Sequence, residues 1–324
     1  MKDFEEKVTG FLHDKTPFFF VIDFLKSDPQ VYTFEEAAEH RIFFDIKGMT
    51  NENTDEKIIP EAIPIALKAK PISLETYEKA FRTVKNEIFG GNSFLLNLTF
   101  PTPLETSVGL ETIYGQASAP YKLLYKDNFV VFSPECYLKF KEGYVYSYPM
   151  KGTINSAIPN AEEKLLSNQK ELQEHHTIVD LIRNDLSMIA NEVTVTKFRY
   201  IETIKKGGEE LLQTSTEIRG KLPEGWEQNF ASLLLKTLPA GSISGAPKNK
   251  TLDIISKVEL WPRGFYTGIF GVFDGRDIDS AVSIRFIEKQ ENALVYKSGG
   301  GITHLSTLEE EYQELLEKIY VPVV

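Results

Sequence analysis

Residues 264–301 read GFYTGIFGVFDGRDIDSAVSIRFIEKQENALVYKSGGG, and this stretch decides the fold. Apolar strand-forming residues are interrupted by turn residues at Asp274-Gly275 and near Glu291-Asn292, which predicts a strand-turn-strand-turn-strand run. Strands joined by such short turns pair antiparallel, because a parallel pair needs a crossover of about a dozen residues or more. The stretch therefore predicts antiparallel sheet structure near the end of the chain.

The remaining chain alternates further strands with helices. Apolar runs predict strands at 18–24, 93–102, 126–153 and 192–203, the third of them around a turn at Gly143. Amphipathic patterns predict helices at 74–92, 161–190, 228–242, 246–259 and 306–321, the first ended by Gly90 and Gly91. Antiparallel strands interleaved with helices indicate an α+β fold, with the helices packed outside the sheets.

Length and charge limit the classes of partner. The 324 residues can bury a sizeable core, as one large domain or two ordinary ones. Thirty-six basic residues against 47 acidic ones give a net charge of −11, which disfavours nucleic acid or an anionic membrane as a partner. A local pocket can still be positive, so a small anionic substrate stays open.

The cysteine count and the N-terminus bear on the compartment. Cys136 is the single cysteine, which excludes an internal disulfide framework and a cysteine-rich metal site and indicates a reducing compartment. Residues 1–15 are too acidic for a signal peptide, and the apolar run 17–25 is too short to span a membrane. We therefore expect a cytoplasmic protein with no membrane partner.

Acidic residues on two predicted helices are candidate metal ligands. Glu311, Glu314 and Lys318 fall at i, i+3 and i+7 of the last helix and form one stripe. The stripe is either a solvated acidic edge or a set of oxygen ligands for a hard cation, most naturally Mg²⁺. Glu174 lies on the same stripe of its helix as Ile178 and Leu181, so it needs a partner or a metal if that stripe is buried.

Glycine-rich runs and three polar side chains are candidate anion ligands. The runs 298–302 (SGGGI) and 239–248 (PAGSISGAPK) are either tight turns or cradles of backbone N–H groups for a carboxylate or phosphate. Arg285 could form the fork for a substrate carboxylate or a structural ion pair, and Tyr266 could donate to the same group or merely pack. Glu135 and Lys151 lie on either side of a predicted hairpin, as a salt bridge or as an acid and a nucleophile facing one cavity.

Taken together, these segments resemble the chorismate-utilising enzymes, which include component I of anthranilate synthase and of aminodeoxychorismate synthase, and the isochorismate and salicylate synthases. The motifs that carry the resemblance, in the family's order, are SPECYL, YPMKGT, EHHTIVDLIRNDL, PAGSISGAPK, RGFYTGIFG, IDSAVSIRF, SGGGI and EEEYQELLEK. The resemblance implies a single catalytic domain over 1–324, with a shortened N-terminal part (about 1–92) and a motif-bearing core (about 93–320).

The fold that the resemblance implies is a four-layer α/β/β/α arrangement with two orthogonally packed antiparallel sheets. Its cleft would bind Mg²⁺ and chorismate, a dicarboxylate with an enol-pyruvyl group. The implied metal ligands are Glu174, Glu314 and Glu311. The implied substrate-binding residues are Arg285, Tyr266, Ser242, Gly299, Gly300, Gly301, Thr153 and Lys318.

The residue type at the position of Lys151 differs between members of the family. Anthranilate synthases look like PIAGT at this position and aminodeoxychorismate synthases like PIKGT, whereas this chain reads PMKGT. In the second group the lysine amine is thought to attack C2 of the ring, after which ammonia adds at C4. A lysine nucleophile needs a pKa below its usual value of about 10.4, and we expect the metal and Lys318 to lower it. Glu135 would be the general acid and then the base.

The resemblance thus favours synthesis of 4-amino-4-deoxychorismate for p-aminobenzoate and folate, with anthranilate or isochorismate synthesis as alternatives. A non-catalytic anion-binding module is a more distant alternative. Two positions depart from the family pattern: Gln213 stands where many relatives have histidine, and Leu305 where many have aspartate. Cys136 does not lie on the glycine-flanked turn of a class I amidotransferase, so we expect ammonia from a separate glutamine amidotransferase subunit.

Overall fold

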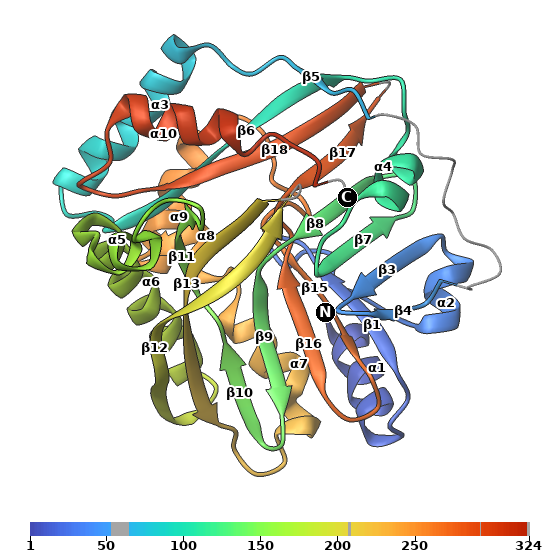
Figure 1. The fold of residues 1–324 in the computed structure, drawn as a ribbon. Coiled ribbons are helices and arrows are strands. Elements are labelled where there is room, and N and C mark those ends of the chain that lie inside the picture. The colour runs from blue at the N-terminus through green and yellow to red at the C-terminus, as the bar shows by residue number, and fades with distance from the viewer. Residues whose placement is uncertain (53–64, 207–208, 292, 323–324) are drawn as a thin grey trace.

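The computed structural model describes residues 1–52, 65–206, 209–291 and 293–322. Within these residues the strands form two sheets of nine strands each, and every pairing is antiparallel (Figure 1). In order, the first sheet contains β11 (Met150–Asn155), β13 (Glu209–Lys221), β10 (Tyr144–Ser147), β9 (Cys136–Lys141), β16 (Ile278–Val282), β15 (Ile269–Phe273), β1 (Phe18–Ile22) and β2 (Gln30–Thr33). Its remaining strand, β12 (Asn191–Lys206), pairs with β13.

The second sheet carries the glycine-rich strand. In order, it contains β14 (Gly245–Ala246), β6 (Leu95–Glu105), β18 (Ala293–Ile302), β17 (Phe286–Gln290), β8 (Phe129–Ser133), β7 (Tyr121–Tyr125), β3 (Ile42–Ile46) and β4 (Met49–Thr50). The short strand β5 (Lys68–Ala69) pairs with β6. The run SGGGI (298–302) forms the end of β18 and pairs with β6 as far as Ile302.

The helices cover the outer faces of the sheets. They are α1 (Lys2–His13), α2 (Phe34–Glu39), α3 (Leu74–Phe89), α4 (Leu110–Gln116), α5 (Ala161–Ser167), α6 (Gln169–Ser187), α7 (Trp226–Thr237), α8 (Gly241–Ser244), α9 (Lys248–Val258) and α10 (Leu308–Glu317). None of them, within the described chain, has the length and apolarity that a membrane crossing demands.

Strand β1 shows how the layers are built. All five of its residues are buried, and successive side chains point to opposite faces of the sheet. Phe18, Phe20 and Ile22 pack with the helix-side core, whereas Phe19 and Val21 pack between the two sheets. A continuous apolar run is therefore required here, because both faces of the strand are covered.

Aromatic contacts mark each of the three interfaces between layers. Phe230 of α7 packs edge-on against Phe140 of the first sheet with 5.0 Å between ring centroids. Phe19 and Phe44 stack at 5.0 Å between the sheets. Outside the second sheet, Tyr114 and its neighbours on α4 pack with a separate apolar cluster of β7, β8, β17 and β18. The predicted four-layer α/β/β/α fold is confirmed, and the strands of the two sheets cross in Figure 1.

The stretch that predicted the fold passes from one sheet to the other. Its first hairpin, β15–β16, belongs to the first sheet, and its second, β17–β18, belongs to the second. The first predicted turn is present, since the Asp274 carboxylate accepts bonds from the backbone N–H groups of Arg276 and Asp277. Glu291 of the second turn has a left-handed backbone, and Asn292 lies outside the described residues.

Two such crossings run side by side. The chain also passes from the second sheet to the first between β8 and β9, at Pro134 and Glu135. The backbone N–H of Val282 donates to the carbonyl of Glu135 (3.3 Å), and that of Phe132 donates to the carbonyl of Arg285 (3.1 Å). The crossing at 283–285 is therefore bonded to the crossing at 134–135. Arg285, predicted within a strand, lies instead in the segment 283–285 between β16 and β17. The chain must leave the hydrogen bonds of the first sheet there before it joins the second sheet.

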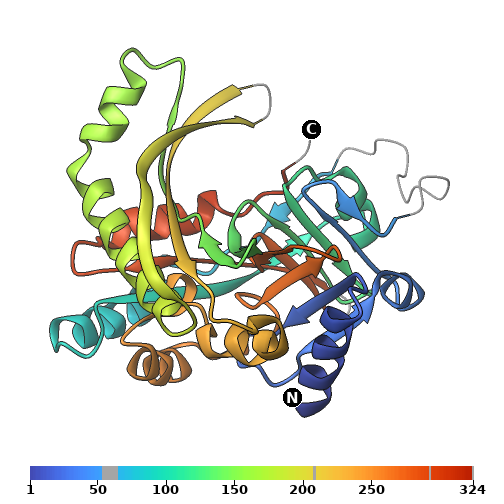
Figure 2. The ribbon, with the colours of Figure 1, turned by 90° about the horizontal axis from the view of Figure 1, so that it is seen from below.

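The predicted helix 161–190 consists of two helices. Asn168 separates α5 from α6, and its side-chain oxygen accepts a bond from the backbone N–H of Glu171 (3.1 Å). This is the usual arrangement of a helix N-cap. Figure 2 shows α5 and α6 beside the long, curved hairpin of β12 and β13.

Candidate active site

A cavity of about 320 Å³ lies where the two crossings meet α6, α10 and the glycine strand β18. The predicted site residues that line it are Glu135, Lys151, Glu174, Ser242, Tyr266, Arg285, Gly299, Gly300, Gly301, Glu314 and Lys318. These residues come from segments far apart in the sequence. The fold therefore brings most of the predicted set to one cavity.

Glu135 lies at the crossing between β8 and β9. Burial raises the pKa of its carboxyl to about 7, although the positive charges of Arg285 and Lys318 act in the opposite direction. A carboxyl with a pKa near neutrality can both donate and accept a proton at physiological pH. Glu135 therefore has the property that a general acid–base group requires.

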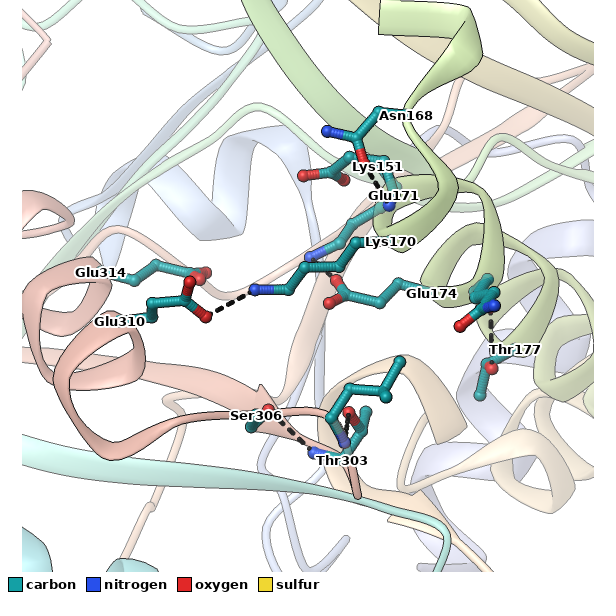
Figure 3. Close-up of polar contacts among 12 residues, drawn as sticks. Lys151, Asn168, Lys170, Glu171, Glu174, Thr177, Thr303, Ser306, Glu310 and Glu314 are labelled. Atoms are coloured by element: carbon teal, nitrogen blue, oxygen red, sulfur yellow. Dashed lines mark hydrogen bonds and ion pairs between the residues drawn. The ribbon is translucent and has the colours of Figure 1, made fainter.

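Lys151 is the second residue of the irregular strand β11. Its backbone carbonyl accepts a bond from the hydroxyl of Thr214, and its ammonium pairs with the Glu174 carboxylate at 2.7 Å (Figure 3). Burial acts to lower the pKa of Lys151, but the negative charges of Glu174, Glu314 and Glu171 outweigh it and the pKa is raised. The neighbouring carboxylates therefore stabilise the protonated amine here, and the lowering expected from bound Mg²⁺ stays a prediction for the metal-loaded site.

The register of β11 explains which of its side chains reach the cavity. Pairing with β13 is irregular between Met150 and Thr153, and Gly152 has a left-handed φ of 83°. Lys151 and Gly152 line the cavity, whereas Thr153 is exposed and does not. The prediction that Thr153 lines the pocket is wrong, because this irregularity breaks the simple alternation of sides along the strand.

Arg285 offers an unpaired donor to the cavity. Its backbone is left-handed (φ 53°), an uncommon conformation for a residue other than glycine. Its Nε is buried without a hydrogen-bond partner, and its guanidinium lies 5.2 Å from the ring centre of Tyr320. A buried donor without a partner is costly, and a bound carboxylate would satisfy it.

The glycine strand packs closely against its neighbours, and a side chain at Gly299 would clash with β6. A Cβ on Gly299 would lie 2.6 Å from the carbonyl oxygen of Leu98, and one on Gly300 would lie 3.2 Å from Oε2 of Glu311. The ammonium of Lys318 donates to the carbonyl of Gly299 (2.8 Å) and pairs with Glu314 (2.6 Å). The glycines therefore bring the strand backbone close to both the cavity and the carboxylates of α10.

The carboxylates of α6 and α10 suit a hard cation in their chemistry. Glu174 of α6 and Glu314 of α10 project from opposite sides of the same cavity (Figure 3). Burial, together with the nearby charges of Glu314 and Glu174, raises the pKa of Glu311, and Oε2 of Glu171 is buried without a partner. Such crowded oxygens are typical ligands of Mg²⁺. In the residues described, no three potential ligands already converge as a metal centre, and Lys151 and Lys318 pair with two of the carboxylates.

Glu311, predicted as a ligand, is buried behind Gly300 and does not itself line the cavity. Other residues at the site were not predicted. Lys297 lines the cavity, is 3% exposed, and donates to the backbone carbonyls of Pro262 and Arg263 at 3.0 Å each. Glu171 lies one turn before Glu174 on α6, and this i, i+3 spacing is a sequence signal that could have revealed it.

Comparison with known proteins assigns the family. The chorismate binding enzyme family matches residues 15–323. The chain belongs to this family. An uncharacterised "PabA-like" protein of Pasteurella multocida is 50% identical over 320 residues, which are 99% of this chain and 98% of that protein. The family acts on chorismate, so the chain is a chorismate-utilising enzyme.

Relatives with different reactions match over a shorter part of their length. Anthranilate synthase component 1 of Neisseria meningitidis serogroup B is 31% identical over 282 residues, 79% of this chain and 55% of that one. Aminodeoxychorismate synthase component 1 of Bacillus subtilis is 29% identical over 267 residues, 78% of this chain and 56% of that one. Family membership therefore fixes the substrate class and leaves the reaction open.

Solved structures support the fold. Anthranilate synthase component I of Streptococcus pneumoniae superposes with a TM-score of 0.71 at 21% identity, covering 96% of this chain and 84% of that one. The menaquinone-specific isochorismate synthase of Escherichia coli superposes with a TM-score of 0.72 at 14% identity, covering 98% and 80%. At these identities the likeness concerns the fold of the family and not the reaction.

Proposed function

We propose that this chorismate-binding enzyme makes 4-amino-4-deoxychorismate from chorismate and ammonia. The observation that carries the proposal is the position of Lys151, whose amine lies in the wall of the cavity that also contains Glu135. A lysine at this position supplies a nucleophile that an alanine cannot. The product would serve p-aminobenzoate and folate synthesis in the cytoplasm.

Binding of chorismate would use the positive and neutral donors of the cavity. Arg285 and Tyr266 would hold the enol-pyruvyl carboxylate, together with backbone N–H groups near Gly299 and Gly301. Lys318 and Ser242 line the same cavity and would complete its polar wall. Mg²⁺ held by Glu174 and Glu314, with Glu311 behind them, would supply positive charge for the ring carboxylate.

The reaction would proceed in two displacements. The neutral amine of Lys151 forms a bond to C2, both ring double bonds shift by one position, and the C4–O bond breaks. Glu135 gives its proton to the departing hydroxyl, which leaves as water. Ammonia then forms a bond to C4, both double bonds shift back, and the electron pair of the C2–N bond returns to Lys151. Glu135 takes up the proton that the incoming nitrogen loses, so that the enzyme is restored.

A separate glutamine amidotransferase subunit would supply the ammonia. Cys136 is buried in β9, and burial raises the pKa of its thiol to about 12. Such a thiol is almost entirely protonated at neutral pH and is a poor nucleophile. The name "PabA-like" of the Pasteurella relative agrees with a link to this type of system.

The test is the product formed by the purified chain with chorismate, Mg²⁺ and an ammonium salt. We expect 4-amino-4-deoxychorismate by mass spectrometry, and a covalent chorismate adduct on Lys151 under short reaction times. Lys151→Ala should lose both, whereas Lys141→Ala, a partly exposed lysine on β9 of the same sheet, should lose neither. Full amination activity in Lys151→Ala would refute the nucleophile.

Anthranilate synthesis is the second candidate, because anthranilate synthase components are among the relatives at about 30% identity. It predicts anthranilate and pyruvate as products, in the same assay and without a lysine adduct. Isochorismate would show that water and not ammonia is the nucleophile. The absence of any chorismate turnover would favour a binding module.

A further inference from the structure

Tyrosine side chains surround the guanidinium of Arg285. Burial acts to lower the pKa of this group, but Tyr296, Tyr320 and Tyr266 act in the opposite direction and the pKa is raised. The guanidinium carbon lies 5.2 Å from the ring centre of Tyr320, and the guanidinium donates a hydrogen bond to the Tyr320 side chain. The groups that support the positive charge of Arg285 are therefore phenols, which are neutral at physiological pH.

A phenol can orient a guanidinium without cancelling its charge. A protein carboxylate in the same place would neutralise the guanidinium and compete with the carboxylate of a substrate. A tyrosine instead offers its ring face and its hydroxyl oxygen, and both are uncharged. Among the residues that the structure describes, Nε of Arg285 is buried and has no hydrogen-bond partner. Arg285 therefore keeps both its charge and an unused donor for a substrate.

Tyr320 differs from the other two tyrosines in its place in the fold. Tyr296 is fully buried within β18, and Tyr266 is buried and itself lines the active-site cavity. Tyr320 follows α10 in the segment 319–322 and is partly buried. It contacts Arg285 but does not line the cavity. An effect of Tyr320 on the substrate must therefore pass through Arg285.

The segment 319–322 is fixed on both sides of Tyr320. The hydroxyl of Tyr296 donates to the backbone carbonyl of Tyr320 (3.1 Å), and the backbone N–H of Ser118 donates to the carbonyl of Pro322 (2.7 Å). The residues immediately before and after Tyr320 pack against the apolar cluster outside the second sheet. In Figure 1 the chain leaves α10 and runs back toward β8 and α4. These contacts hold the Tyr320 ring at a defined place beside Arg285.

We propose that Tyr320 is a positioning residue for chorismate, because it holds the Arg285 guanidinium in the orientation that receives the enol-pyruvyl carboxylate. This inference rests on the proposed function, in which Arg285 binds that carboxylate. The chain after α10 then contributes twice to the site, since Lys318 lines the cavity and Tyr320 supports Arg285 from outside it. The enol-pyruvyl group is retained throughout the proposed reaction, so its contact contributes equally to the substrate complex and to the transition state.

The test separates substrate binding from turnover. Tyr320→Leu removes the ring and the hydroxyl, whereas Tyr320→Phe removes only the hydroxyl. Tyr144→Leu is the matched control, because Tyr144 is also partly buried beside an arginine, with the guanidinium carbon of Arg219 at 4.6 Å from its ring centre, and does not line the cavity. Initial rates of chorismate consumption are measured with chorismate varied at saturating ammonium and Mg²⁺. The Tyr320 variants are made in the wild-type protein and in Arg285→Lys, which keeps the charge and loses the planar fork.

We expect Tyr320→Leu to raise the KM for chorismate about tenfold and Tyr320→Phe about threefold, with kcat changed less than about twofold in each, because binding is lost equally in both states. In the Arg285→Lys protein, Tyr320→Leu should change this KM less than about twofold, because the group that Tyr320 positions is already absent. The control should change neither constant.

An unchanged KM for chorismate in both Tyr320 variants, or an equal rise in the wild-type and Arg285→Lys proteins, overturns the positioning role. If Tyr320→Leu does not fold, Tyr320→Phe decides by the same two criteria, since it keeps the packed ring. The proposed function is judged separately, by the product of the parent enzyme. Anthranilate or isochorismate as that product overturns the amination, whereas the KM comparison still decides the role of Tyr320, because it follows consumption of chorismate.

Discussion

Replacement of Glu135 by glutamine removes the titrating group that the fold buries at the strand crossing. The side chain keeps nearly the same shape, so the packing around Pro134 and Cys136 should be retained. In the wild-type protein, burial raises the pKa of Glu135 from 4.5 to about 7. In the unfolded chain the carboxyl returns to its ordinary value, so folding and protonation are linked.

The sign of the effect follows from this shift. Between pH 4.5 and about 7 the folded protein holds a proton on Glu135 that the unfolded chain has lost. This contribution to stability is fully present below pH 4.5 and is lost as the pH rises through about 7. A shift of about 2.5 pH units at 1.36 kcal/mol each gives about 3 kcal/mol, which is an upper value because the side chain faces an open cavity.

The assay is urea unfolding of wild type and Glu135→Gln from pH 5 to pH 8.5. We expect the variant to gain stability relative to wild type as the pH rises, by roughly 2 to 3 kcal/mol at pH 8, with little further change above that. Glu224→Gln, at an exposed carboxyl in the loop before α7, serves as the control and should show no such trend. A difference between variant and wild type that is constant with pH would refute the buried, proton-holding Glu135. The same variant should lose amination activity by about a hundredfold or more, as expected for loss of a general acid.

Three further perturbations test contacts around the site. Lys85→Met should lower the free energy of unfolding by about 1 to 3 kcal/mol, because three carbonyls of the loop 303–306 lose a charged donor. Lys85→Arg should retain most of the wild-type stability, and a Lys85→Met variant as stable as wild type would contradict the loop contact. The exposed ion pair of Lys170 on α6 and Glu310 on α10, at 2.8 Å, should show a small coupling in a double-mutant cycle that weakens as salt is added. A large coupling that salt does not change would contradict a solvated pair. Burial raises the pKa of Cys136 to about 12, so iodoacetamide at pH 7.5 should alkylate it slowly in the folded protein and rapidly in urea, and equal rates would contradict that burial.

The regular parts of the fold could be predicted because their patterns are local. The hairpin β15–β16 follows from its apolar strands and the Asp274 turn, and α3 ends at Gly90 where its amphipathic pattern ends. The break between α5 and α6 was missed because the pattern of polar and apolar residues continues across Asn168. Its capping bond to the Glu171 backbone is favourable, but the sequence alone does not show whether it interrupts a helix or lies on its surface.

The sequence predicted most of the residues that form the site but not how they are arranged in space. Lys297 was missed, because its partners, the carbonyls of Pro262 and Arg263 and the carboxylate of Glu288, approach it only in the folded chain. Thr153 was placed in the site by the resemblance, and the irregular register of β11 keeps it out of the cavity. The pairing of Lys151 with Glu174 was not predicted, because it depends on how α6 lies against the sheet.

The position of the site follows from the two crossings between the sheets. A side chain inside a regular strand points into one of the packed layers on either side of its sheet, and there it contacts other core residues. Where the chain changes sheet it leaves both ladders, and its side chains face the junction between them. Glu135 and Arg285 occupy such positions on neighbouring, oppositely directed crossings. Their approach is set by pairing of Cys136 with Ala281 in one sheet and of Val131 with Phe286 in the other. An acid and an arginine far apart in the sequence therefore meet at one cavity because two registers, one in each sheet, fix the same junction.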